Sequence, residues 1–148
     1  MKITERTNPK RYFDKKEFWI PEDISGVSST RLRGMHSYWG ENYVFCMSRV
    51  SIIEAKLKEL RQRRRVIFNN KFILYKERRL ANQYAWIQAE NHTKVIKFDD
   101  KINVLEIQLE IWRSLMDSCK TYKEICSRDQ SFREKELDHY FKRGGQGK

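Results

Sequence analysis

The stretch LRGMHSYWGENYVFCMSRVSIIEAKLKEL, from Leu32 to Leu60, decides the fold, because its apolar and aromatic side chains recur at alternating spacings of four and three. Such spacings return to one face of an α-helix, so the stretch predicts a long helix with a single packing seam. Ser28, Ser29 and Thr30 precede it and supply oxygens that cap a helix N-terminus. The first seam consists of Leu32, His36, Trp39, Tyr43, Cys46, Val50, Ile53, Leu57 and Leu60.

A second amphipathic helix is predicted from Asp99 and Asp100, whose negative charges suit a helix start. Its apolar face is broad enough to contact two neighbours, which favours an oligomer. Lys123 interrupts the seam. The second seam consists of Ile102, Leu105, Leu109, Trp112, Met116, Cys119 and Cys126, and Ile111, Leu115 and Tyr122 widen it.

The remaining segments complete a mainly α fold, in which long amphipathic helices pack as a helical hairpin or coiled-coil stem and oligomerisation covers the thin core. Thr93 to Phe98 alternates in polarity, which suggests a short strand or extended linker between the helices. Ser131 and Glu134 have capping-box spacing, which predicts a separate short C-terminal helix. The expected organisation is an N-terminal arm at 1–27, a helical oligomerisation domain at 28–143 and a flexible tail at 144–148.

The N-terminal arm contains Pro9, Pro21 and Gly26, which disfavour long regular elements, so it is expected to be loosely structured with at most a short helix. We expect it to dock through Phe18 and Trp19. These rings either cover the main helix or receive a neighbouring subunit or another protein.

Positive charge is concentrated in KLKELRQRRRVIFNNKFILYKERR, from Lys56 to Arg79, which we call the basic block. It carries ten Lys or Arg residues against Glu59 and Glu77, a net +8 of the chain's +11. Cations neutralise phosphates and interleaved rings stack on bases, a combination that suits single-stranded nucleic acid. The predicted phosphate contacts are Lys58, Arg61, Arg63, Arg64, Arg65, Lys71, Lys76, Arg78 and Arg79, with Phe68, Phe72 and Tyr75 as stacking candidates.

Two alternatives qualify the interpretation of the basic block. A charge run can be a solvated helix face, and Phe68 and Phe72 are four apart, as core residues of one face also are. Because Arg64 and Lys71 continue the seam positions and cations are costly to bury, we expect helix contact to stop near Leu60. The basic block would then project from the packed stem.

Several functional classes are disfavoured by the sequence. It shows no catalytic constellation, glycine-rich phosphate loop or paired-carboxylate pattern, so we predict neither an enzyme nor a cofactor. Cys46, Cys119 and Cys126 lack metal-site spacing and are predicted to be buried apolar side chains. No apolar run is long enough for a membrane span or signal peptide, which predicts a cytoplasmic protein without membrane contact.

The order of these parts resembles the UvsY family of phage recombination mediators over about Glu17 to Gly145. The resemblance rests on MHSYW at Met35–Trp39, the basic block ending in aromatic residues, DDKINVLEIQLEIW at Asp99–Trp112 and Ile-x-x-Arg ending at Arg128. Two features depart from the family pattern: FILYKER stands where two tyrosines and a glycine are common, and Asp129 replaces a frequent glycine.

What the resemblance implies is a non-enzymatic protein that binds single-stranded DNA as a ring-shaped homo-oligomer. It also implies a RecA-like recombinase and a single-strand binding protein as partners, in the cytoplasm of an infected host cell. The alternative is a coiled-coil assembly protein whose basic patch binds an acidic partner or nucleic acid non-specifically. A basic-zipper transcription factor is disfavoured because the cations here follow the seam, and a membrane-surface helix because the apolar residues of the block are scattered.

Overall fold

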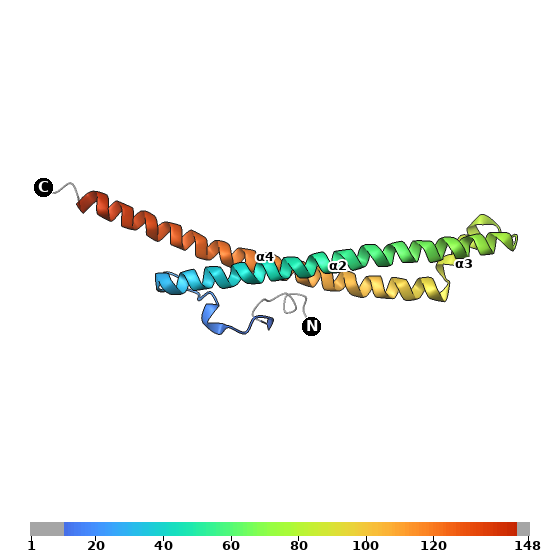
Figure 1. Ribbon diagram of the computed structural model, residues 1–148, viewed down its shortest axis with the longest axis horizontal. Coiled ribbons are helices and arrows are strands. Elements are labelled where there is room, and N and C mark those ends of the chain that lie inside the picture. The colour runs from blue at the N-terminus through green and yellow to red at the C-terminus, as the bar shows by residue number, and fades with distance from the viewer. Residues whose placement is uncertain (1–10, 145–148) are drawn as a thin grey trace. The chain divides into compact units, whose positions relative to one another are not determined.

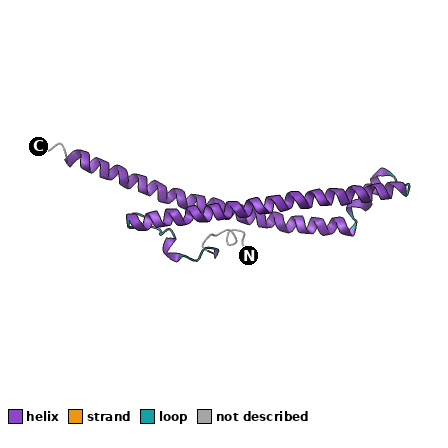
Figure 2. Ribbon diagram, in the orientation of Figure 1, coloured by secondary structure: helices purple, strands orange, loops and turns teal. Residues whose placement is uncertain are grey.

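The computed structural model describes residues 11–144, and all regular structure among them is helical (Figure 2). A 3-10 helix, η2, covers Lys16–Phe18, and three α-helices follow: α2 at Ser29–Glu77, α3 at Asn82–Glu90 and α4 at Thr93–Gly144. The predicted mainly α fold with long packed helices is confirmed (Figure 1). The start of the predicted arm and the tail after Gly144 lie outside the described residues.

The chain forms two compact units. The first contains the residues up to Met47 and those from Trp112 onward, and the second contains Ser48–Ile111. Helices α2 and α4 each contribute one stretch to both units, whereas α3 belongs entirely to the second. The whole basic block therefore lies in the second unit.

Both predicted seams are the buried faces of their helices. The predicted cap is also present, since Ser28 Oγ accepts the Arg31 N–H at 3.3 Å one residue before α2 begins. Seam residues His36, Tyr43 and Leu60 are half-buried. The buried seam residues are Leu32, Trp39, Cys46, Val50, Ile53 and Leu57 on α2, and Ile102, Leu109, Cys119 and Cys126 on α4.

Packing in the first unit centres on Trp39, which is fully buried. Its ring centroid lies 4.8 Å from that of Tyr122 on α4 and 6.0 Å, edge-on, from that of Phe13 in the arm. Its indole N–H donates to the Phe18 carbonyl at 2.9 Å. One side chain thus joins both long helices and the arm.

Of the two arm rings that were predicted to dock, Phe18 packs on α2. That ring stacks on Tyr38 with centroids 5.0 Å apart. A Cβ built on Gly34 would lie 3.0 Å from Phe18 Cε1, so the ring occupies the space that a side chain would fill. Trp19 instead donates its indole N–H to the Phe13 carbonyl at 3.3 Å, which closes the arm on itself.

The predicted separate C-terminal helix is wrong, because α4 continues without interruption through Ser131. No Pro or Gly breaks the stretch from Arg128 to Gln130, so polarity alone does not end the helix. Arg133 also holds this turn in the first unit. Its guanidinium pairs with Asp129 at 2.7 Å and donates to the Val27 and Ile24 carbonyls at 2.5 and 3.1 Å.

The predicted strand or linker at Thr93–Phe98 is also wrong, because these residues form the first turns of α4. His92 starts this helix: its Nδ1 accepts the Lys94 N–H at 3.2 Å and its carbonyl accepts the Val95 N–H at 2.8 Å. Val95 is fully buried and Phe98 half-buried, three residues apart on one helix face. The negative charges of Asp99 and Asp100 consequently lie inside the helix and not at its start.

Candidate nucleic-acid interface

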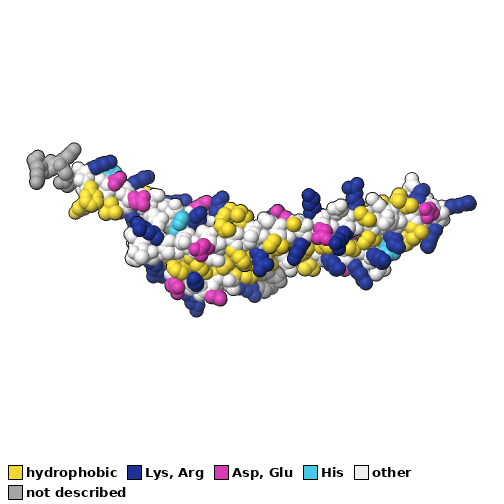
Figure 3. Space-filling view, viewed as in Figure 1, with side chains coloured by type: hydrophobic (Ala, Val, Ile, Leu, Met, Phe, Trp, Pro, Cys, Tyr) yellow, Lys and Arg dark blue, Asp and Glu magenta, His cyan; other side chains and the backbone are white. Residues whose placement is uncertain are grey.

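The basic block occupies the last turns of α2 and the turn that follows. Ten of the twelve predicted site residues lie on α2, and Arg78 and Arg79 lie just after its last residue, Glu77. Figure 3 shows Lys and Arg side chains interspersed with apolar side chains over the second unit. The structure separates the predicted phosphate contacts into paired and unpaired cations.

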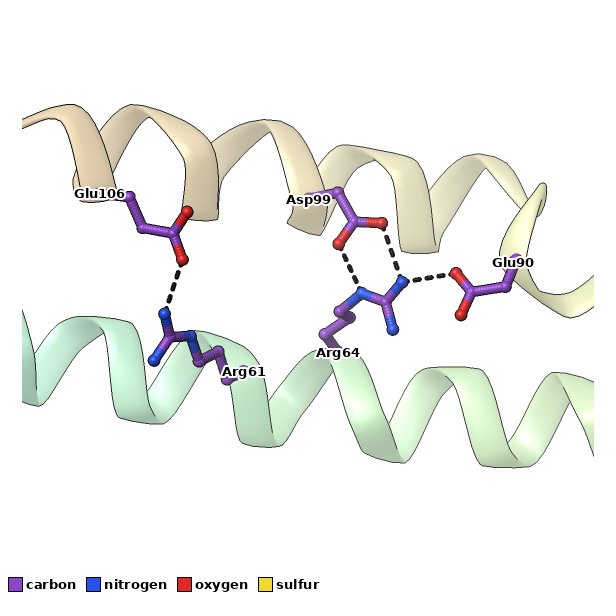
Figure 4. Close-up of polar contacts among 5 residues, drawn as sticks. All are labelled: Arg61, Arg64, Glu90, Asp99 and Glu106. Carbon is purple, nitrogen blue, oxygen red and sulfur yellow. Dashed lines mark hydrogen bonds and ion pairs between the residues drawn. The ribbon is translucent and has the colours of Figure 1, made fainter.

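Arg64 is held by two carboxylates and is the most constrained cation of the block (Figure 4). Its Nε donates to Asp99 at 2.5 Å, and its terminal Nη2 donates to Asp99 at 3.1 Å and to Glu90 at 2.5 Å. Only 26% of its side chain is exposed. The hydrogen bond with Asp99, followed by that with Glu90, raises the pKa of the Arg64 guanidinium, which keeps the group charged.

Helix contact therefore does not stop near Leu60, and that expectation is wrong. The charge at position 64 is compensated by Asp99 on α4 and Glu90 at the end of α3, so a seam cation is accommodated. Beyond it, Phe68 contacts Trp86 of α3 edge-on, with ring centroids 6.1 Å apart. The block is consequently packed against α3 and the start of α4.

Arg61 and Arg63 form weaker pairs. Arg61 binds Glu106 of α4 at 2.6 Å (Figure 4), and Arg63 binds Glu59 one turn earlier on α2 at 2.5 Å. Both arginine side chains are at least 60% exposed. Exposed pairs contribute about 0 to 1 kcal/mol, so an incoming phosphate can replace these carboxylates at little cost.

Six predicted contacts make no ion pair with any described side chain: Lys58, Arg65, Lys71, Lys76, Arg78 and Arg79. Lys76 instead donates to the Leu80 carbonyl, Arg78 lies over the Tyr75 ring, and Arg79 lies in the turn after α2. We call the other three, Lys58, Arg65 and Lys71, the unpaired cations. Lys58 and Arg65 are exposed and Lys71 is half-buried. An anion that binds them displaces no protein carboxylate, so they are the strongest candidates for phosphate contact.

The aromatic residues of the block form a small cluster with a residue that the sequence analysis did not select. Phe68 and Phe72 are half-buried and stacked, with centroids 6.3 Å apart and planes 12° apart. Trp86, which packs edge-on against Phe68, is 52% exposed. Its indole offers more open ring surface than either phenylalanine. Tyr75 is engaged by the Arg78 guanidinium, 5.8 Å from its ring centroid.

Trp86 was missed because no helix was predicted between the basic block and Asp99. Helix α3 is only nine residues long, and its buried side chains are Ala85 and Ala89, which give little periodic signal. The one sequence signal for this helix is the pair Ala85 and Ala89, two small residues four apart that lie on one helix face, with Trp86 between them.

The turn after α2 places Arg79 in the left-handed region, with φ of 60°. Its N–H donates to the Lys76 carbonyl at 2.9 Å, and Lys76 Nζ donates to the Leu80 carbonyl at 3.4 Å. Glycine is the usual residue at such a helix end because it has no Cβ. The basic residue at this position therefore carries a conformational cost.

Replacing Arg79 with Gly should accordingly raise the free energy of unfolding by about 1 kcal/mol, because the left-handed conformation costs an L side chain about that much. Urea denaturation followed by circular dichroism would measure it. The control is Arg78→Gly. Arg78 immediately precedes Arg79 and has no positive φ, so this change should not stabilise the protein. An equal response of both variants would contradict the proposed cost at position 79.

No group of three or more potential metal ligands occurs within 11–144, and no helix there is long and apolar enough to cross a membrane.

The three cysteines are buried, as predicted. Burial raises the pKa of the Cys126 thiol to about 11, so this thiol stays protonated at neutral pH. Desolvation, followed by nearby Lys71 and Lys94, lowers the pKa of His92.

Comparison with known proteins identifies a solved structure with a similar fold. No family model matches the chain, and no curated protein matches it. The chain is similar in structure to the crystal structure of the bacteriophage T4 recombination mediator protein UvsY, with a TM-score of 0.63 and 17% sequence identity. The match covers 92% of this chain and 99% of the T4 chain. The two chains share one fold over nearly their full lengths.

Proposed function

We propose that this protein is a recombination mediator that binds single-stranded DNA through the unpaired cations and the adjacent rings. In this role it assists a RecA-like recombinase in replacing the single-strand binding protein on DNA, in the cytoplasm of an infected host cell, and catalyses no reaction itself. The likeness to a protein described as a recombination mediator supports the role. The observation that carries the binding mode is the presence of Lys58, Arg65 and Lys71, without carboxylate partners, in the same unit as exposed Trp86.

The arrangement suits a flexible single strand better than a rigid duplex. Lysine and arginine bind phosphates without regard to sequence, and an exposed indole stacks on an unpaired base. Base stacking on an aromatic side chain is worth about 1 to 3 kcal/mol per base. Arg61 and Arg63 add phosphate contacts when a phosphate replaces Glu106 or Glu59.

One copy of this surface would bind weakly in physiological salt, so we include a homo-oligomer, ring-shaped by the family resemblance, in the proposal. Repetition of the site on one assembly raises the effective concentration, which can strengthen binding by about 10² or more. Exposed apolar side chains of the second unit offer surface for contacts between copies, with Leu60, Val104 and Leu105 lining an apolar groove. Other exposed apolar side chains of this unit include Ile52, Val66 and Ile107.

A triple variant, Lys58→Gln, Arg65→Gln and Lys71→Gln, tests the binding mode. Each phosphate contact to a single strand contributes about 0.7 to the slope of log affinity against log salt, so the slope should fall by about 2. Fluorescence anisotropy with a labelled oligothymidine at several salt concentrations measures it. Because none of the three side chains is in an ion pair, helicity should be unchanged.

The matched control is Arg128→Gln, Lys135→Gln and Lys142→Gln, which removes the same charge from exposed positions of α4 in the first unit. Its salt slope should stay near that of the unaltered protein. If both triple variants lose affinity equally, binding follows net charge and the assignment to the basic block is wrong.

One observation favours the alternative of an assembly protein with an acidic partner: Arg61 and Arg64 already bind carboxylates of α3 and α4. Competition between duplex and single-stranded DNA at several salt concentrations separates the two functions. A mediator should prefer the single strand at every concentration. Equal, weak and fully salt-sensitive binding of both would support the assembly protein.

A further inference from the structure

A groove lined by basic and polar residues lies in the first unit, and the proposed function uses none of these residues. His36 and Tyr43 of α2 line one side, and Lys120, Lys123 and Ser127 of α4 line the other. Glu124 also lines the groove and lies 4.0 Å from Lys120, so its carboxylate faces a cation already present there. The groove offers an imidazole, two hydroxyls and two ammonium groups.

Lys123 is seated in this groove by the backbone of α2. A Cβ built on Gly40 would lie 3.8 Å from both Cδ and Cε of Lys123, which places the lysine stem directly over the glycine. The side chain is half-buried and interrupts the second seam, where apolar residues otherwise stand. Its apolar stem is covered while its charged end reaches the groove.

The charge of Lys123 is not compensated within the described chain. Arg64, also half-buried at a seam position, is matched by two carboxylates. Lys123 makes no ion pair with any described side chain. An anion that enters the groove can therefore bind the Lys123 ammonium group without displacing a protein carboxylate from it.

We propose that this groove binds a phosphate group through Lys123. The ammonium group provides the charge, and the Tyr43 and Ser127 hydroxyls and the His36 ring provide further hydrogen-bond donors, which together suit a tetrahedral oxyanion. The phosphate can belong to a polynucleotide backbone or be free in solution. The polynucleotide case rests on the proposed function, whereas the free-phosphate case does not.

The central variant is Lys123→Met, which keeps the apolar stem and removes the charge. Amide NMR shifts of His36, Tyr43 and Ser127 would be followed while inorganic phosphate, and separately an oligothymidine, is added to the full chain. We expect the shift changes to be lost in Lys123→Met and retained in Lys123→Arg. Lys135→Met is the matched control, because this exposed lysine lies on the same helix outside the groove.

A thermal melt separates binding from folding. If Lys123 serves a ligand, Lys123→Met should melt at about the same temperature as the unaltered protein in phosphate-free buffer, because the covered stem is kept and no ion pair is lost. A lower melting temperature would assign Lys123 a structural role and overturn the proposal. Groove signals that move with neither probe, or equally in Lys123→Met, would also overturn it.

The two probes distinguish the sources of phosphate. Movement with the oligothymidine supports the polynucleotide, and movement with inorganic phosphate alone supports the free anion and rejects the polynucleotide. The triple variant of the basic block keeps this result separate from the proposed function. If that variant binds oligothymidine normally but the groove still responds to phosphate, the proposed function fails and the groove assignment stands.

Discussion

Replacement of Trp39 by alanine should lower the free energy of unfolding by about 3 to 5 kcal/mol, the cost typical of removing a large buried aromatic side chain. Trp39 is fully buried, contacts the rings of Phe13 and Tyr122, and donates to the Phe18 carbonyl. The variant loses packing between both long helices and leaves the part-buried Phe18 carbonyl without its donor. Urea denaturation followed by circular dichroism measures the loss.

Trp86→Ala is the control for this prediction, because it removes the same side chain from an exposed position. Its contact with Phe68 is a single edge-on ring pair, and such pairs contribute about 0.5 to 1.5 kcal/mol. The two variants should also differ in binding, since Trp86 belongs to the proposed DNA surface and Trp39 does not. If both changes lower the free energy of unfolding equally, packing in the first unit does not centre on Trp39.

Removing the Arg64 side-chain charge by Arg64→Met should destabilise the second unit by about 1 to 3 kcal/mol. The change leaves Asp99 and Glu90, both partly withdrawn from water, without their cation. Arg64→Lys should be intermediate, because an ammonium group keeps the charge but cannot reproduce the forked geometry of a guanidinium. Chemical denaturation followed by the helical circular dichroism signal would give the three values.

Arg61→Met provides the comparison for Arg64. Its pair with Glu106 is exposed, with 60% and 42% of the two side chains accessible, so its loss should cost at most about 1 kcal/mol. A mild effect of Arg64→Met, matching that of Arg61→Met, would show that the three-residue contact contributes nothing beyond a surface pair. Arg64 is consequently a poor position at which to test DNA binding, because folding and binding would change together.

The long helices could be predicted from the sequence because helical periodicity is a local property. Each seam repeats at three and four residues over many turns, and every residue so identified is buried or half-buried. For Phe18 the sequence left two alternatives open, and the structure shows the first of them, with the ring covering the main helix. Local capping signals were less reliable: Ser28 caps α2, whereas Ser131, with the same type of signal, lies within α4.

The roles of individual cations could not be predicted, because they depend on residues distant in the chain. Arg64 is 26 residues from Glu90 and 35 from Asp99, and nothing near Arg64 in the sequence indicates either contact. Sequence analysis identified the basic block correctly as a concentration of charge. It could not separate Lys58, Arg65 and Lys71, which remain unpaired, from the arginines that hold the helices together.

The close fit of Phe18 against Gly34 bears on how the protein can be shortened for experiments. A fragment beginning at Ser28 would lack the ring over Gly34, the carbonyl that receives the Trp39 indole and the aromatic cover from Phe13. Such a fragment would expose an apolar surface to solvent and should aggregate or bind hydrophobic dyes. Truncations intended to isolate the helices should therefore retain the chain from Arg11 onward.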